Sequence, residues 1–79
     1  MQLGDCVKVP DGRVGRIRNI EEENIRVRVM RTTSYTHQFL LYNKAALKVI
    51  ACPKGWMSPK GYNRYLTTTL AKMKEHNAK

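Results

Sequence analysis

Four arginines that alternate with apolar residues on two neighbouring segments are the side chains best suited to chemistry. They are Arg16, Arg18, Arg26 and Arg28. Pairing Ile17 with Val27 in the core of an antiparallel hairpin puts all four on the outer face, Arg16 opposite Arg28 and Arg18 opposite Arg26. Like charges directly across a ladder destabilise it, whereas guanidinium groups bind phosphates and carboxylates well. The hairpin therefore predicts a site for an anionic ligand. Solvated arginines, screened by Glu21–Glu23 or covered by a helix, are the alternative.

The charge of the whole chain favours a polyanionic partner. Fifteen Lys and Arg against six Asp and Glu give a net charge of +9, and every acidic residue except Glu75 lies before residue 24. A field of this sign attracts polyanions and speeds their encounter. RNA or DNA, an anionic membrane surface and an acidic protein partner all fit it. A solvated basic surface without a dedicated ligand fits it as well.

Four further residues complete the predicted nucleic-acid site. They are Arg31, Lys48, Tyr35 and Tyr42. The two basic residues extend the arginine patch if the fold brings them to its side, and the two tyrosines are candidates for stacking on bases. We assign Phe39 to a strand core and Trp56 to a plug where the C-terminal helix begins. An aromatic cage for a methylated side chain is a weaker alternative, because acidic residues are missing from this half of the chain.

The spacing of ligand-type side chains gives little support to metal binding or catalysis. The candidate ligands are Cys6, His37, Cys52 and His76. They lack the short paired spacings of zinc sites. The acidic residues lie in predicted turns and at a hairpin tip, and a histidine and a cysteine without a third orienting group do not make a nucleophile. We therefore predict a protein that is not an enzyme and holds neither a metal nor a cofactor.

The cysteines and the hydropathy of the chain give indications of the cellular compartment of the protein. Cys6 and Cys52 lie in apolar, strand-like contexts, and reduced thiols in a cytoplasmic protein are the simplest interpretation. A disulfide between them is the alternative. The first ten residues lack the charged start and apolar run of a secretory signal. No segment approaches the roughly 20 apolar residues that span a bilayer, so we predict no membrane association.

Short apolar segments separated by turn signals predict five strands over residues 1–51. The segments are Cys6–Val9, Val14–Ile20, Ile25–Val29, Tyr35–Tyr42 and Leu47–Ile50. Pro10-Asp11-Gly12 marks a turn, and Gly15 predicts a bulge or bend inside the second strand. Five short strands bent at glycine suggest a small barrel, which hides its sheet edges.

The pattern of these strands also resembles a known family. The chain carries Gly4-Asp5-x-Val7-x-Val9-x-x-Gly12-x-x-Gly15-x-Ile17, then a hairpin, then Leu47-x-Val49-Ile50. This pattern resembles SH3-like barrels, and among them the KOW-type domains of ribosomal proteins and transcription elongation factors. The resemblance covers residues 3–29, and the usual glycine-rich second turn is shortened. It implies a small barrel that meets RNA or protein within larger assemblies.

The last third of the chain predicts one helix. A connector over residues 52–58 ends in Ser58-Pro59, an N-cap followed by proline at the first helical position. One apolar stripe then recurs at spacings of three and four, made of Tyr62, Tyr65, Leu66, Thr69, Leu70 and Met73. We expect a helix over residues 59–76 that packs on the barrel within a single structural domain. A homodimer contact is the alternative use of the stripe, and a monomer is favoured.

Together these features predict a mainly β protein, a five-stranded SH3-like barrel with one C-terminal α-helix packed on it. Its predicted function is binding of RNA or DNA through phosphate contacts, without sequence specificity. A protein-interaction module or a small subunit of a larger complex is the alternative.

Overall fold

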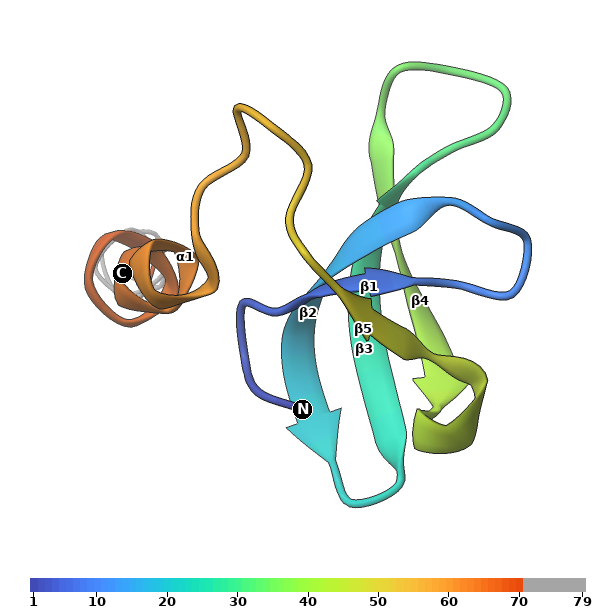
Figure 1. Ribbon diagram of the computed structural model, residues 1–79, viewed down its shortest axis with the longest axis horizontal. Coiled ribbons are helices and arrows are strands. Elements are labelled where there is room, and N and C mark those ends of the chain that lie inside the picture. Colours follow the sequence, from blue (N-terminus) through green and yellow to red (C-terminus); the bar gives the residue numbers. More distant parts are fainter. Residues whose placement is uncertain (71–79) are drawn as a thin grey trace, which may run out of the picture.

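The computed structural model describes residues 1–70, which form one antiparallel sheet followed by a helix (Figure 1). The strands are β1 (Cys6–Lys8), β2 (Val14–Glu21), β3 (Asn24–Met30), β4 (His37–Asn43) and β5 (Lys48–Ile50). A 3₁₀ turn, η1 (Lys44–Ala46), joins β4 to β5, and α1 (Pro59–Tyr65) continues as a π-helical turn, η2 (Leu66–Leu70). The mainly β architecture with five strands and a C-terminal helix is confirmed.

The sheet is open and not a closed barrel. Its strands are hydrogen-bonded in the order β4-β3-β2-β1-β5, so β4 and β5 form its two edges. Within residues 1–70 no pairing joins these edges. Both β1 and β5 have only three residues, and after β5 the chain leaves the sheet toward the helix (Figure 1). The expected barrel closure is therefore not found.

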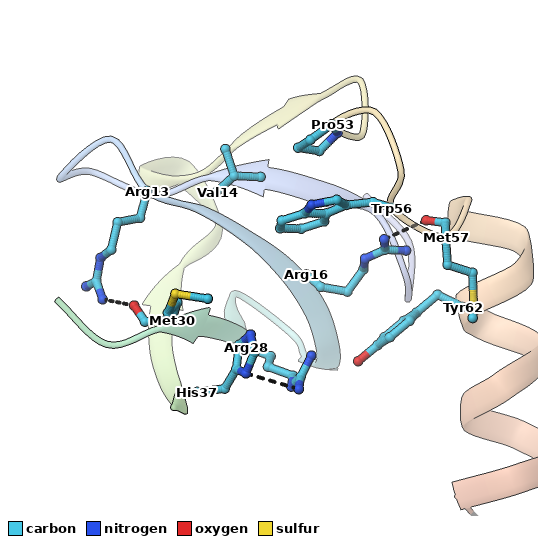
Figure 2. Close-up of a pocket in the computed structure, with 10 residues that line it drawn as sticks. All are labelled: Arg13, Val14, Arg16, Arg28, Met30, His37, Pro53, Trp56, Met57 and Tyr62. Atoms are coloured by element: carbon cyan, nitrogen blue, oxygen red, sulfur yellow. Dashed lines mark hydrogen bonds between the residues drawn. The ribbon is translucent and has the colours of Figure 1, made fainter. Parts of the chain in front are cut away.

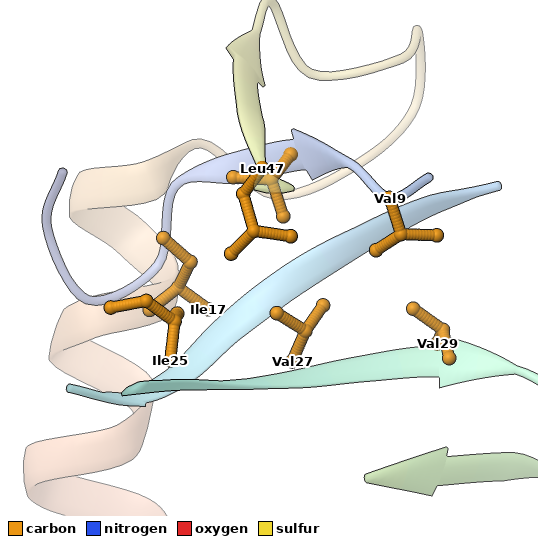
Figure 3. Packing of buried hydrophobic residues seen from close by; sticks show 7 residues of the cluster. Val9, Ile17, Ile25, Val27, Val29 and Leu47 are labelled. Carbon is orange, nitrogen blue, oxygen red and sulfur yellow. The ribbon is translucent and has the colours of Figure 1, made fainter. Parts of the chain in front are cut away.

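The hydrophobic core lies against one face of the sheet (Figure 3). Its buried members are Val7, Val9, Ile17, Ile25, Val27, Val29 and Leu47. Strict alternation along β3 turns Ile25, Val27 and Val29 toward this face and its two arginines toward the other, which we call the outer face. The predicted pairing of Ile17 with Val27 is confirmed.

The irregularity in β2 falls at Arg18. Ile17 lies opposite Val27, but Asn19 lies opposite Arg26, so Arg18 is an extra residue that has no direct partner on β3. The prediction that Arg18 lies opposite Arg26 is wrong. The bulge removes a directly opposed pair of like charges from the ladder.

Of the two alternatives predicted at Gly15, a bulge or a bend, the bulge is not found. Gly15 lies in regular register opposite Val7 on β1. A Cβ at this position would come within 2.5 Å of both the Val27 and Val29 side chains. Glycine is required there because β2 passes directly over core residues of β3.

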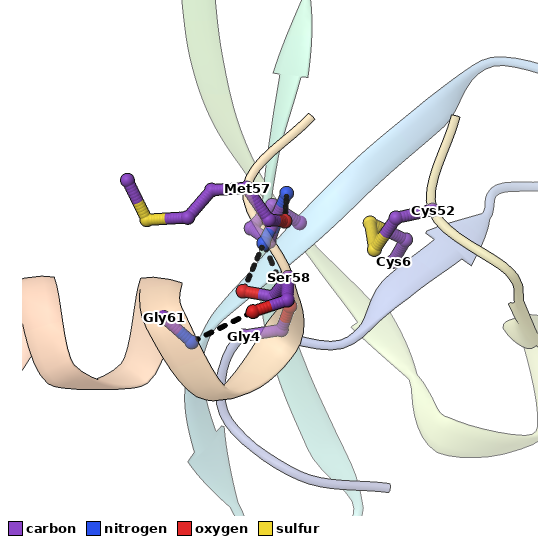
Figure 4. Close-up of a disulfide and its surroundings, with 7 residues drawn as sticks. Gly4, Cys6, Cys52, Met57, Ser58 and Gly61 are labelled. Carbon is purple, nitrogen blue, oxygen red and sulfur yellow. Dashed lines mark hydrogen bonds between the residues drawn. A yellow bond between two sulfur atoms is a disulfide. The ribbon is translucent and has the colours of Figure 1, made fainter. Parts of the chain in front are cut away.

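A disulfide ties β1 to the connector after β5 (Figure 4). Cys6 and Cys52 are bonded, with their Cα atoms 5.2 Å apart. Pairing of β1 with β5 sets Cys6 opposite Ile50, which brings Cys52 close to it. The expectation of reduced thiols is therefore wrong for this structure. The cytoplasmic location, which depended on reduced thiols, stays a prediction.

The helix begins where the sequence predicts. Ser58 Oγ accepts a hydrogen bond from the Gly61 N–H at 3.1 Å, and Pro59 occupies the first helical turn (Figure 4). The start of the chain packs against this cap at Gly4, which has a φ of +91°. A Cβ on Gly4 would overlap the Pro59 carbonyl oxygen, so the close approach depends on glycine.

The apolar stripe of the helix is described in part. Tyr62 is buried, Tyr65 and Leu66 are half-buried, and Thr69 is exposed. The Leu70 side chain, Met73 and the predicted end of the helix lie outside the described residues. No helix within residues 1–70 has the length and apolar character that crossing a membrane requires.

Candidate functional site

Arg16 is the buried member of the predicted arginine patch. It lies opposite Arg28, as predicted, but it is only 4% exposed. The connector and α1 cover it. Its guanidinium donates hydrogen bonds to the main-chain carbonyls of Gly4 at 3.2 Å, Met57 at 2.5 Å and Ser58 at 3.3 Å. The expectation that all four arginines point into solvent is wrong for Arg16, because these three carbonyls take up three of its five N–H donors.

Two aromatic rings complete the surroundings of Arg16. Its guanidinium carbon lies 4.5 Å from the centre of the Tyr62 ring and 5.7 Å from that of Trp56. Burial lowers the pKa of Arg16 from its ordinary value, Tyr62 opposes this, and the nearby charge of Arg28 adds to the lowering. An arginine nonetheless stays protonated in proteins. Arg16 therefore acts as a fixed cation that holds the helix and the connector on the sheet.

The other three arginines remain at the surface of the outer face. Arg26 is exposed, and Arg18 and Arg28 are half-buried. The Arg18 guanidinium lies 4.9 Å from the centre of the Phe39 ring on β4. Within residues 1–70 none of the three makes an ion pair with a carboxylate. Their charges are available to an external anion.

Arg28 also fixes the neighbouring histidine. Its Nη2 lies 3.2 Å from His37 Nδ1. Arginine can only donate, so His37 Nδ1 accepts, and the proton of the neutral ring is on Nε2. The Nε2–H of His37 then supplies a further donor beside Arg28.

The remaining predicted site residues do not gather at one place. Arg31 is exposed at the start of the β3–β4 loop, where Tyr35 is 93% exposed. Lys48 lies on β5, at the opposite edge of the sheet from β4. Tyr42 lies opposite Ile25 and packs against the core. Tyr42 is therefore on the wrong face to stack on a ligand held by the arginines.

A groove of about 660 Å³ lies where the outer face meets the connector (Figure 2). Its lining residues are Arg13, Val14, Arg16, Arg28, Met30, His37, Pro53, Trp56, Met57 and Tyr62. Figure 2 shows Trp56 and Arg28 on opposite sides of Arg16. The lining combines apolar side chains with three arginines and a histidine, and among residues 1–70 no acidic side chain contributes to it. It suits a ligand that has a flat apolar part and a negative charge.

Arg13 stands at the rim of this groove. Its Nη1 donates to the Met30 carbonyl at 2.6 Å, and its Nε forms an ion pair with Asp11 at 2.7 Å. The Asp11 carboxylate also accepts from the Arg13 main-chain N–H at 3.0 Å, and this bond is the main cause that lowers the pKa of Asp11. These contacts orient Arg13 and leave its other guanidinium nitrogen, Nη2, without a hydrogen-bond acceptor among residues 1–70.

Two aromatic residues of the site were assigned wrongly from sequence. Phe39, expected in a strand core, is 50% exposed on the outer face, and Trp56, expected as a plug, is 45% exposed in the groove wall. Phe39 lies opposite Arg28, a register that turns Leu40 inward and Phe39 outward. Successive residues of β4 face opposite sides of the sheet, so the sequence indicates the outward position of Phe39 only once the register of β4 with β3 is known. Trp56 lies in an irregular connector, where no periodicity indicates its face.

Within residues 1–70 no group of three His, Cys, Asp or Glu side chains is placed to hold a metal ion. Comparison of the chain with protein-family models, with curated proteins and with solved structures finds no significant match. The resemblance to SH3-like barrels and KOW-type domains therefore stays a prediction.

Proposed function

We propose that this protein binds nucleic acid through the outer face of β2, β3 and β4. The observation that carries the proposal is that Arg18, Arg26 and Arg28 share this face without a carboxylate partner among residues 1–70. Guanidinium groups that are not paired with a carboxylate bind phosphate oxygens through charge-assisted hydrogen bonds. Phe39 adds a half-exposed ring beside Arg18, which suits stacking on a base.

We also propose that the fold is SH3-like. Five short antiparallel strands in the order β4-β3-β2-β1-β5 support this, together with the KOW-like spacing of Gly4, Gly12 and Gly15. Such a fold supports many functions, so the arginine face carries the functional argument.

Fluorescence-anisotropy titration with mixed-sequence RNA and DNA oligomers tests the proposed function. Phosphate contacts make affinity depend on salt, with a log–log slope of about 0.7 to 0.9 for each contact. Three contacts therefore predict a loss of about 20- to 40-fold between about 50 and about 200 mM salt. The absence of binding at the lower salt concentration contradicts the proposal.

A matched pair of charge reversals distinguishes the arginine face from general basicity. Arg26 is exposed on β3, and Lys44 is exposed in η1, outside the outer face of the three strands. Arg26→Glu and Lys44→Glu change the net charge equally. We expect Arg26→Glu to weaken binding about tenfold at low salt and Lys44→Glu to weaken it much less. Equal losses show that only net charge matters.

One observation favours a protein partner as the second candidate. On the edge strand β4, Leu41 and Phe39 are both about half exposed and lie on the same face. An exposed edge with apolar side chains suits pairing with a strand of another protein. In that case Leu41→Lys abolishes partner capture, and Arg26→Glu has little effect on it.

A further inference from the structure

We infer that the groove beside Trp56 receives an unpaired base, so that the preferred ligand is single-stranded nucleic acid. This inference rests on the proposed function and names the form of nucleic acid. It comes from the position of the groove at one end of the arginine face, between Arg28 and the connector (Figure 2). A strand that contacts Arg26 and Arg28 along β3 is directed toward the groove.

The walls of the groove match the two parts of a nucleotide. Trp56, Met30 and Met57 each expose more than two fifths of their surface. An unstacked base covers such apolar surface and stacks on an indole ring. The cavity volume lies within the range of about 300 to 1,000 Å³ that small-molecule sites occupy. On the other side, Arg28 supplies charge for a phosphate, and the rim residue Arg13, whose charge is paired with Asp11, supplies further N–H donors from Nη2.

Arg16 holds the groove in shape before a ligand arrives. Its guanidinium lies near the Trp56 ring and is hydrogen-bonded to the carbonyls of Met57 and Ser58 on the connector. The wall that carries Trp56 is therefore attached to the sheet by partly buried hydrogen bonds. A ligand that enters does not have to order this wall, and such preorganisation favours binding.

The position of Trp56 disfavours a duplex. Bases inside a duplex are stacked and paired, and exposing one to a side chain requires unstacking it. A single strand presents its bases without this cost. The groove therefore adds affinity for single strands only, whereas the arginines contact the phosphates of either form.

Intrinsic fluorescence tests the inference directly, because Trp56 is the sole tryptophan of the chain. The 79-residue protein, with its disulfide intact, is titrated with a single-stranded DNA oligomer, its duplex, and an abasic oligomer of equal length. We expect the single strand to change Trp56 fluorescence and to bind about five- to a hundredfold more tightly than the abasic oligomer. The duplex and the abasic oligomer leave the fluorescence unchanged.

Variants separate the groove from the rest of the surface. Trp56→Ala is expected to remove the advantage of the single strand over the abasic oligomer, and Trp56→Phe, which keeps a ring, to retain most of it. Val49→Ala removes part of an apolar side chain that is 48% exposed on β5 and outside the groove lining, so it serves as the control. An equal loss from Val49→Ala overturns the assignment of the groove.

The outcomes also distinguish the two proposals. Equal affinity for all three oligomers, with unchanged Trp56 fluorescence, overturns the base site and leaves the arginine face as a phosphate-binding surface. No binding of any oligomer at about 50 mM salt overturns both. A fluorescence change only with an acidic, aromatic-containing peptide assigns the groove to a protein ligand and also overturns the inference.

Discussion

Arg16 and Arg26 carry the same side chain on neighbouring strands, and their surroundings assign them opposite roles. Arg16 is buried and donates to three main-chain carbonyls from two distant parts of the chain. Arg26 is exposed. Removal of a buried charged donor leaves its acceptors unsatisfied, whereas removal of an exposed one leaves the fold unchanged. Stability and ligand binding therefore depend on different members of one sequence pattern.

This difference gives the first prediction. We expect Arg16→Gln to lower the free energy of unfolding by about 2 to 4 kcal/mol and Arg26→Gln by less than about 0.5 kcal/mol. Urea unfolding followed by circular dichroism measures both. Arg16→Lys is expected to recover only part of the loss, because an ammonium group lacks the planar fork that reaches several carbonyls. Equal stability of Arg16→Gln and the unchanged protein contradicts a structural role for Arg16.

The sequence predicts the position of Arg16 on the outer face but not its burial. Alternation around Ile17 is local, so the face could be predicted. The main-chain carbonyls that accept from Arg16 on the connector belong to Met57 and Ser58, more than forty residues later in the chain. No local sequence pattern predicts that contact. The sequence indicates covering of the arginines by a helix only as one of two alternatives, the other being screening by Glu21–Glu23.

At the level of elements, the docking of α1 depends on a glycine before the first strand. Gly4 and Gly12 both have positive φ values, +91° and +95°. A Cβ on Gly4 overlaps the Pro59 carbonyl, whereas a Cβ on Gly12 has no atom within 4 Å. Both positions therefore have a backbone conformation that favours glycine, and they differ only in whether neighbouring atoms occupy the space of an added Cβ.

The second prediction uses these glycines as a pair. Gly12→Ala is expected to cost about 1 to 2 kcal/mol through backbone conformation alone. Gly4→Ala is expected to cost more and to displace α1, because the added methyl group meets main-chain atoms that cannot rotate away. Urea unfolding gives both losses, and Trp56 fluorescence reports displacement of the connector. A Gly4→Ala loss no larger than that of Gly12→Ala shows that the close approach does not hold the helix.

The elements were predicted to different degrees for physical reasons. Strands and the helix start follow from alternation and from Ser58-Pro59, which are local signals. The bulge at Arg18 and the outward position of Phe39 depend on register between strands, which the sequence of one strand does not contain. Barrel closure depends on whether the short β5 reaches β4, and the strand count alone does not determine this.

For the whole molecule, the disulfide is the main stabilising feature that the amino-acid composition does not predict. A small domain has a limited core, and within residues 1–70 seven buried apolar side chains form the core cluster. Cys6 and Cys52 are separated by 46 positions, and a cross-link over such a span stabilises the native state mainly by restricting the unfolded chain.

The third prediction follows from this cross-link. Reduction is expected to lower the free energy of unfolding by about 2 to 4 kcal/mol. The measurement is the urea midpoint with and without a reducing agent. In the double variant Cys6→Ala/Cys52→Ala the reducing agent is expected to have no effect, which controls for its other actions. An unchanged midpoint in the unsubstituted protein contradicts a stabilising disulfide.

The same bond changes the covalent connectivity of the molecule. All five strands lie between Cys6 and the residues just before Cys52, so the disulfide closes the entire sheet into a single macrocycle, with the helix as an exocyclic tail. A protease that cuts once in the exposed loop between β3 and β4 leaves two polypeptides, one with β1, β2 and β3 and the other with β4, β5 and the helix, joined by the Cys6–Cys52 bond. The nicked protein therefore stays one covalent molecule until the disulfide is reduced.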